Sequence, residues 1–202
     1  MSNRLFCFGL GFVAQALAAR LGANGWRIAG TVRDGDKAMA LVAKGIAVSI
    51  FDRGQLPDES ALAGATHILL SIPPGEQGDP VLTACGHQLA AKAKNLSWIG
   101  YLSTTGVYGD RGGAMVDETT PVAPGNDRSR RRAAAEAAWL EFGRAHGVPT
   151  HVFRLAGIYG PGRSTLDSVR AGTARRIEKP GQVFSRIHVD DIAAVLAASI
   201  AR

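Results

Sequence analysis

The chain has 202 residues, of which 46% are hydrophobic and 20% are charged, and this composition excludes a disordered protein and predicts one folded domain over residues 1–202. Its formal net charge of +6 would attract phosphates of any kind, nucleic acid included. Aromatic residues make up only 6% of the chain and are not interleaved with the arginines, so we expect no nucleic-acid partner.

The first predicted strand ends in a glycine turn of the form GxGxxA, which leads directly into a predicted helix. Gly9 can adopt backbone angles that other residues avoid, Gly11 leaves no side chain between the backbone and a pyrophosphate, and Ala14 lets the helix lie close to the strand. Such turns also occur for packing alone. The free N–H groups of a helix start bind anions, so we predict a dinucleotide pyrophosphate site at Gly9, Gly11, Phe12 and Val13.

The second predicted strand, residues 26–32, is followed by Arg33 and Asp34. The end of this strand meets the adenosine ribose in a strand–helix–strand unit, where an acidic residue holds a 2′-hydroxyl and an arginine accommodates a 2′-phosphate. Arg33 offers a planar, permanently charged fork for such a phosphate, so we predict NADP(H) as the cofactor. Asp34 keeps NAD(H) open as the alternative, and Arg33 could also be an ordinary surface arginine.

Helices and strands continue to alternate, which predicts an α/β fold with a doubly wound parallel sheet covered by helices on both faces. Ligands of such sheets bind at the carboxyl ends of the strands. We therefore predict that Asp52, facing the adenine amino group, and Ser71 bind the cofactor, although both residue types also occur in ordinary turns. The further predicted elements are helices over residues 12–22, 36–44 and 80–95 and strands over residues 46–51, 66–72 and 98–102.

Three hydroxyl residues, Ser103, Thr104 and Thr105, follow the fifth predicted strand, and Tyr108 lies between two glycines just beyond them. At the ligand edge of the sheet, a hydroxyl can bond a substrate carbonyl or a nicotinamide. The same residues could equally cap the next turn.

Five segments of the chain occur in an order that is typical of one superfamily. They are the glycine turn with Gly9, Gly11 and Ala14, the segment Leu102 to Gly109 with VYG, the loop from Asp117-Glu118 to Pro121 and Pro124, the segment Arg154 to Gly162 reading RLAGIYGPG, and Ile187 to Asp191 reading IHVDD. With these motifs the whole chain resembles the extended short-chain dehydrogenase/reductase superfamily, the NAD(P)-dependent epimerase/dehydratase group. The resemblance implies an NAD(P)-binding Rossmann fold, for which we expect the strand order 3-2-1-4-5-6.

The same resemblance places the catalytic Ser/Thr of the family at Thr104. The family also carries a Tyr and a Lys four residues apart on the next helix, and with Glu136 aligned these positions hold Arg128 and Arg132. In the family the Tyr exchanges a proton with the substrate and the Lys holds the nicotinamide ribose. Arg132 can replace the Lys at the ribose, but Arg128 does not release its proton near neutral pH. The remaining candidates for the proton donor are Tyr108, Tyr159 and His188.

Arginines crowd the start of the predicted helix over residues 129–146, where positive charge is unfavourable. A bound anion, from the cofactor or from an acidic substrate, would explain their presence, and a solvated charged face is the alternative. These residues are Arg128, Arg130, Arg131 and Arg132.

The extended family members continue well past the HVDD helix into a substrate lobe, whereas the last predicted element here covers residues 191–201. We expect residues 157–185 to be a remnant of that lobe, which is reduced or missing. A trimmed domain and a naturally minimal protein both remain open. If the lobe is trimmed, the apolar surface that it covers would be exposed, and a homodimer would bury that surface.

Two cysteines, Cys7 and Cys85, fit neither a metal-ligand spacing nor a disulfide framework. We therefore expect no metal site and a reducing, cytoplasmic compartment. No segment is long and apolar enough to span a bilayer, so no membrane partner is expected. The apolar stretch after Arg4 is similar to a signal peptide, but Gly9 and Gly11 interrupt it.

The sequence thus predicts an atypical NAD(P)-dependent oxidoreductase or nucleotide-sugar epimerase-like enzyme without the usual Tyr/Lys pair. Its partners would be the dinucleotide and a small-molecule substrate that the sequence does not identify. Thr104 and Arg132 are the predicted catalytic residues. The alternative is a non-catalytic NADP-binding sensor or regulatory module, which the loss of both family residues permits.

Overall fold

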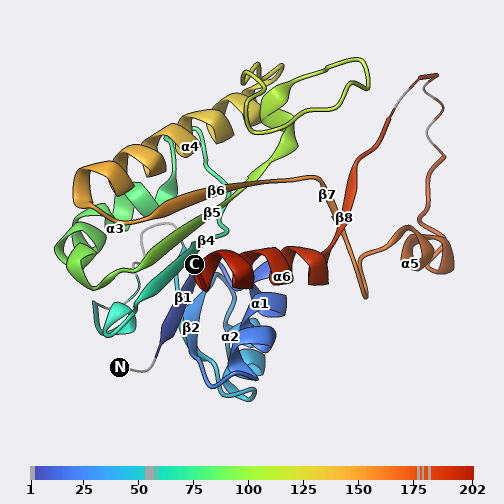
Figure 1. Ribbon diagram of the computed structural model, residues 1–202. Helices are drawn as coiled ribbons and strands as arrows, with labels where there is room; N and C mark the ends of the chain where they lie inside the picture. Colours follow the sequence, from blue (N-terminus) through green and yellow to red (C-terminus); the bar gives the residue numbers. More distant parts are fainter. Residues whose placement is uncertain (1–2, 53–56, 58, 177, 179, 182) are drawn as a thin grey trace.

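The structure, a computed structural model, describes residues 3–52, 57, 59–176, 178, 180–181 and 183–202. Its centre is a six-stranded parallel sheet in the order β3-β2-β1-β4-β5-β6 (Figure 1), which is the Rossmann order predicted from the sequence. The strands of this sheet are β1 (Arg4–Phe8), β2 (Arg27–Val32), β3 (Ala47–Ile50), β4 (His67–Leu70), β5 (Trp98–Thr104) and β6 (Thr150–Leu155). A separate small parallel sheet pairs β7 (Gly157–Tyr159) with β8 (Arg186–His188).

Helices cover both faces of the six-stranded sheet. In Figure 1, α3 and α4 lie on one side of it and α1, α2 and α6 lie on the other. The helices are α1 (Phe12–Gly22), α2 (Gly35–Val42), α3 (Pro80–Ala91), α4 (Asp127–His146), α5 (Thr165–Arg170) and α6 (Val189–Ile200), with short 3₁₀ turns η1 (Glu59–Leu62), η2 (Ala93–Asn95) and η3 (Thr105–Tyr108). None of the helices in the described ranges is long and apolar enough to cross a membrane.

Strand β1 shows why the central strands read as continuous apolar runs. Phe6 and Phe8 pack into the core beneath α3 and α4, while Leu5 and Cys7 pack into the core beneath α1, α2 and α6. Successive side chains of a strand point to opposite faces, and here both faces are covered. Burial raises the pKa of the Cys7 thiol to about 12, so that thiol stays protonated at neutral pH.

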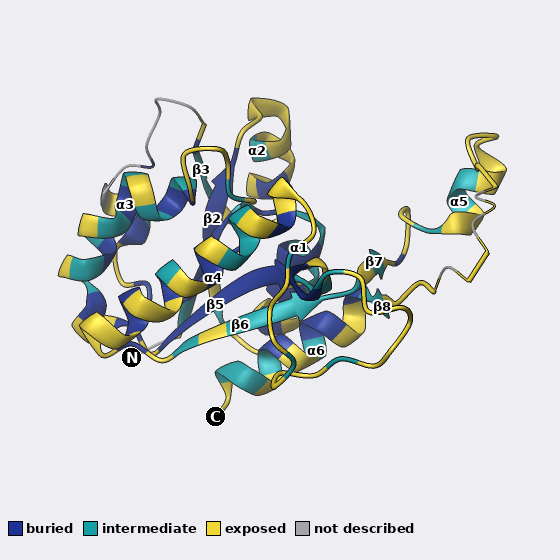
Figure 2. Cartoon of the chain, turned by 90° about the horizontal axis from the view of Figure 1, so that it is seen from above, coloured by how far each residue is buried: buried dark blue, intermediate teal, exposed yellow. Residues whose placement is uncertain are grey.

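Beyond β6 the chain leaves the main sheet and forms an arm, largely in the region expected to be a remnant of the substrate lobe. The short strands and the helix of this arm were not predicted from the sequence. The arm contains β7, α5 and β8, and Figure 2 shows it projecting from the body with mostly exposed residues. No residue of α5 is buried. Strands of three residues and a helix of six are too short to give a clear periodicity, which explains why sequence patterning did not find them.

His67 makes stability depend on pH at the amino edge of the sheet. The ring is buried between Trp26 and Trp98 and lies 2.8 Å from the hydroxyl of Thr66, measured from its Nδ1. Burial lowers the pKa of His67 below its ordinary value of 6.5. Protons therefore bind preferentially to the His67 ring of the unfolded chain. The contribution of His67 to the free energy of unfolding is complete above pH 6.5, and it is lost as the pH falls through the lower pKa of the folded protein.

We expect urea unfolding between pH 7 and pH 5 to show this loss in the wild-type protein and a smaller loss in His67→Gln, which has no ring to protonate. Parallel losses in the two proteins would show that His67 is not the source.

Candidate cofactor-binding site

The turn between β1 and α1 depends on Gly9. Its φ of +88° lies in the region that favours glycine, and a Cβ atom there would come within 3.0 Å of Ser71 Oγ and of Ile72 Cγ1. The Gly9 N–H donates to Thr31 Oγ1 at 2.9 Å, and the Ser71 hydroxyl donates to the Gly9 carbonyl at 2.6 Å. Ser71 therefore contacts the glycine turn from the end of β4. The buried Thr31 was missed because a threonine inside a strand carries no functional signal.

Gly11 differs from Gly9 because the protein itself does not require a glycine there. Its φ of −80° is open to any residue, and a Cβ atom would meet nothing closer than Ser71 Oγ at 3.8 Å. Among the described residues, no acceptor binds the N–H groups of Phe12 and Val13, and the first turn of α1 contains no acidic residue. An open glycine beside free N–H groups fits the pyrophosphate of a dinucleotide.

The carboxyl ends of β2 and β3 lie side by side, because Val32 pairs with Ile50. Arg33 follows β2 as an exposed side chain, and no ion pair engages it within the described part of the chain. The carboxylate of Asp34 accepts the Lys37 N–H at 2.9 Å and so caps α2. Asp52 is exposed just beyond β3.

Thr104 is the last residue of β5 and pairs in register with Leu155. Its hydroxyl oxygen accepts the Gly106 N–H at 3.1 Å, which is the capping role that the sequence left open. Arg132 reaches the same strand from α4, where its guanidinium donates to the Leu102 carbonyl at 2.5 Å and lies 5.8 Å above the ring of Tyr101. The structure therefore brings Thr104 and Arg132 to the same strand end but turns the arginine toward protein partners.

A buried ion pair lies beneath this strand end. Arg154 on β6 binds the Glu136 carboxylate on α4 at 2.9 Å, and Ser103 on β5 donates to the same carboxylate at 2.5 Å. Glu136 raises the pKa of Arg154. Arg154 also donates to the Tyr108 hydroxyl at 3.0 Å, and Tyr108 is itself buried. Tyr108 is thus a buried residue with an arginine partner.

Those other two, Tyr159 and His188, lie together on the arm. Their rings meet edge to face at 5.0 Å, and Tyr159 is 42% exposed. His188 caps α6 by accepting the Asp190 N–H at 3.3 Å. Beside Tyr159, a cleft of about 620 Å³ opens between α5 and the β7–β8 pair, and its basic lining residues are Arg163, Arg175 and Arg186.

Two arginines at the start of α4, Arg130 and Arg131, lie near acidic side chains. Asn126 caps the helix by accepting the Ser129 N–H at 2.9 Å, and Asp127 pairs with Arg130 at 2.6 Å in the first turn. Arg130 lowers the pKa of Asp127. Arg131 lies 3.9 Å from Glu76. No ion pair engages Arg128 in the described ranges, so the acidic side chains of the protein compensate only part of the positive charge at this helix start.

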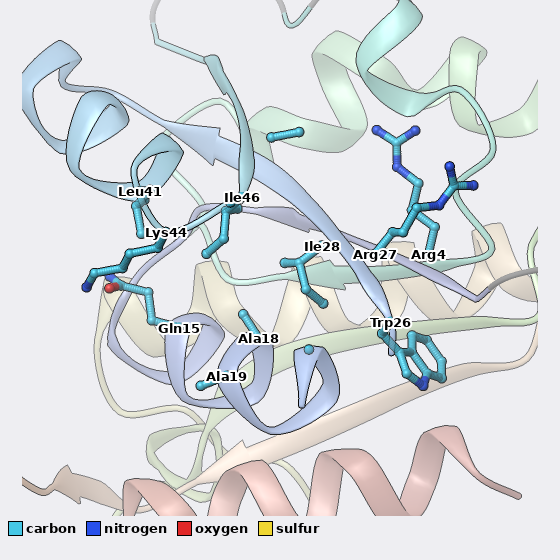
Figure 3. Close-up of a pocket in the computed structure, with 13 residues that line it drawn as sticks. Arg4, Gln15, Ala18, Ala19, Trp26, Arg27, Ile28, Leu41, Lys44 and Ile46 are labelled. Atoms are coloured by element: carbon cyan, nitrogen blue, oxygen red, sulfur yellow. The ribbon is translucent and has the colours of Figure 1, made fainter. Parts of the chain in front are cut away.

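A second hollow, of about 830 Å³, opens at the amino edge of the sheet (Figure 3) and contains none of the predicted site residues. Arg4 and Arg27 border it, but in Figure 3 both guanidinium groups point away from the apolar side chains of Ile28 and Ile46. Arg4 donates instead to the carbonyl of Ala61 at 3.0 Å. The charges around this hollow therefore do not converge on a ligand. No cluster of residues suited to a metal ion occurs within the described ranges.

Comparison with known proteins gives a match to a family model and matches to individual relatives. Residues 82–202 match the model of the NAD dependent epimerase/dehydratase family. Protein YeeZ of Escherichia coli K12 is 31% identical over 164 residues, covering 77% of this chain but only 58% of YeeZ, so the chain spans less than two thirds of that curated relative. A functionally unknown conserved protein from Silicibacter pomeroyi DSS is 51% identical, with a TM-score of 0.89 over 100% of this chain and 69% of the other.

More distant structures share the fold. A UDP-glucuronic acid 4-epimerase from Bacillus cereus, solved in complex with UDP-glucuronic acid and NAD, is 16% identical, with a TM-score of 0.75 over 98% of this chain and 73% of that enzyme. At this identity the likeness concerns the fold alone.

Proposed function

The chain belongs to the NAD dependent epimerase/dehydratase family, and from that premise we propose that it binds NADP(H) at the carboxyl edge of the sheet and acts as an oxidoreductase or epimerase-like enzyme. The observation that carries the proposal is the turn before α1. Gly11 is open without any need of the protein for a glycine, and the N–H groups of Phe12 and Val13 have no acceptor among the described residues. A dinucleotide pyrophosphate uses both features.

The predicted residues of the glycine turn and of the strand ends have distinct roles in this proposal. Gly9, Gly11, Phe12 and Val13 would hold the pyrophosphate, with Ser71 supporting Gly9 through its carbonyl. When bound, such a cofactor supplies hydride exchange with a carbon atom of the substrate. Thr104 would bind a substrate oxygen. The proton donor would come from Tyr159 or His188, because Tyr108 is buried beside Arg154, away from a substrate at the surface.

Two observations favour NADP(H) over NAD(H). Asp34 would be the acidic partner of a 2′-hydroxyl, but its carboxylate already caps α2. Arg33 is exposed next to it, with no ion pair among the described residues. A free guanidinium at the end of β2 suits a 2′-phosphate, and Asp52 on the neighbouring strand end would face the adenine.

We expect Arg33→Ala to weaken NADPH binding by about 10- to 100-fold, because a charge-assisted hydrogen bond to the 2′-phosphate is lost. Binding of NADH should change little, since NADH lacks that phosphate. Fluorescence titration of both nucleotides against both proteins measures the effect. Equal affinity of the wild-type protein for NADPH and NADH, unchanged in the variant, would remove Arg33 from this role.

A second candidate function is a non-catalytic NADP sensor. The observation that favours it is the orientation of Arg132, which donates to the Leu102 carbonyl and stacks over Tyr101. In that position it does not present the free cation that would replace the family lysine. Arg128 stands at the position of the family tyrosine, so the phenol hydroxyl of the family is absent there.

Turnover separates the two candidates. The enzyme hypothesis expects NADPH oxidation or sugar epimerisation with at least one member of a panel of carbonyl compounds and nucleotide sugars. Tight NADPH binding with no turnover on the whole panel would favour the sensor.

A further inference from the structure

The turn that follows β7 packs directly on the start of α1. Gly160 and Arg163 close this turn through two backbone hydrogen bonds of 3.2 and 2.9 Å. A Cβ atom on Gly160 would lie 3.1 Å from Phe12 Cζ and 2.6 Å from Val189 Cγ1, so only a glycine permits this close approach. The arm thereby brings the residue after the RLAGIYGPG motif to the glycine turn, although the two are about 150 residues apart in the sequence.

That residue is Arg163, whose guanidinium carbon lies 5.6 Å above the ring of Phe12. Its side chain is exposed, and no ion pair or side-chain hydrogen bond engages it within the described part of the chain. Cation–π contact with Phe12 orients the guanidinium without neutralising its charge. Arg163 therefore places an uncompensated positive charge beside the first residue of α1.

The guanidinium and the start of α1 carry charge of the same sign. Phe12 begins α1, and the start of a helix already carries partial positive charge from its free N–H groups. The first turn of α1 supplies no acidic side chain that could offset the guanidinium, unlike the start of α4, where Asp127 pairs with Arg130. An anion between the guanidinium and the helix start would accept hydrogen bonds from both and offset the positive charge of both.

We propose that Arg163 is a further cofactor-binding residue, which binds the pyrophosphate of the dinucleotide together with the N–H groups of Phe12 and Val13. This inference rests on the proposed cofactor site. It assigns to the arm a direct part in holding the cofactor. Because Arg163 also lines the cleft between α5 and β7–β8, the same side chain would place the bound cofactor next to that cleft.

Three probes separate this role from that of Arg33. NADPH and 2′-phospho-ADP-ribose both contain the pyrophosphate, whereas adenosine 2′,5′-bisphosphate keeps the 2′-phosphate but has only a monophosphate at the 5′ position. We expect Arg163→Gln to weaken the binding of NADPH and of 2′-phospho-ADP-ribose by about 10- to 100-fold. The affinity for adenosine 2′,5′-bisphosphate should change little. Isothermal titration calorimetry on the full chain measures these affinities. Arg163→Lys, which keeps the charge but loses the planar fork, should fall between wild type and Gln.

The matched control is Arg170→Gln, which removes the same charge from the same arm at an exposed position in the last turn of α5. It should bind all three probes as the wild-type protein does. The inference is overturned if Arg163→Gln binds NADPH as tightly as the wild-type protein does, or if its affinity for all three probes falls equally. It is also overturned if Arg170→Gln lowers the affinity for NADPH as much as Arg163→Gln does. Absence of NADPH binding to the wild-type protein would instead refute the proposed function, and this inference with it.

Discussion

Replacing Arg154 by alanine is expected to lower the free energy of unfolding by about 3 kcal/mol, because it leaves the Glu136 carboxylate buried without its counter-charge. The Glu136 side chain is only 5% exposed, and that of Arg154 is 23% exposed. After the substitution, only the Ser103 hydroxyl would remain on the carboxylate, and the Tyr108 hydroxyl would lose its partner. Urea unfolding followed by circular dichroism measures the loss.

Two controls make this prediction specific. Arg130→Ala breaks the surface pair of Arg130 and Asp127, whose side chains are 56% and 76% exposed, respectively. It should lower the free energy of unfolding by less than about 1 kcal/mol. The double variant Arg154→Met with Glu136→Leu removes both charges and should be more stable than Arg154→Ala alone. If Arg154→Ala costs no more than the surface control, the buried pair does not fasten α4 to the sheet.

Replacing Gly11 by alanine is expected to abolish most NADPH binding while leaving the protein folded. The backbone at Gly11 accepts any residue, and the added methyl group would have ordinary contact with Ser71 Oγ at 3.8 Å. The methyl group would occupy the space through which the pyrophosphate approaches the backbone. We expect the dissociation constant to rise by about 30-fold or more, which corresponds to roughly 2 kcal/mol.

Gly9→Ala is the matched comparison and should give a different result. Its φ of +88° and its 3.0 Å approaches to Ser71 Oγ and Ile72 Cγ1 make alanine strained there, so stability should fall by about 1–3 kcal/mol. Thermal unfolding and NADPH titration on both variants separate the two positions. Wild-type affinity in Gly11→Ala would place the dinucleotide elsewhere on the protein.

The strength of the local signals explains how well the sequence predicted the main elements. Helix α1 has the predicted bounds, and α2 and α3 lie within a few residues of theirs, because capping residues such as Asp34 and Asp79 mark where these helices begin. The predicted strands lie where the sequence has short continuous apolar runs. These strands are buried on both faces, so nearly every residue of the run is apolar and the run is visible in the local sequence.

The predicted site residues share one edge of the sheet because parallel strands place their carboxyl ends together. The glycine turn, Arg33, Asp52, Ser71 and Thr104 all follow or end strands of the same sheet. Asp34 and Thr104 make local capping contacts, within three residues in the sequence. By contrast, the support that Ser71 gives to Gly9 joins residues 62 apart, and it became visible only when the two strand ends were placed side by side.

By itself, the sequence determined the alternation of helices and strands and the position of the glycine turn, because these depend on residues close together in the chain. Only the tertiary structure decided which distant charges meet. Glu136 binds Arg154 from α4 to β6, Arg132 turns toward Leu102, and Arg163 reaches Phe12 through the arm. The direction of a long, flexible side chain depends on the charges and carbonyl groups that folding brings near it, and local sequence patterns carry no record of these neighbours.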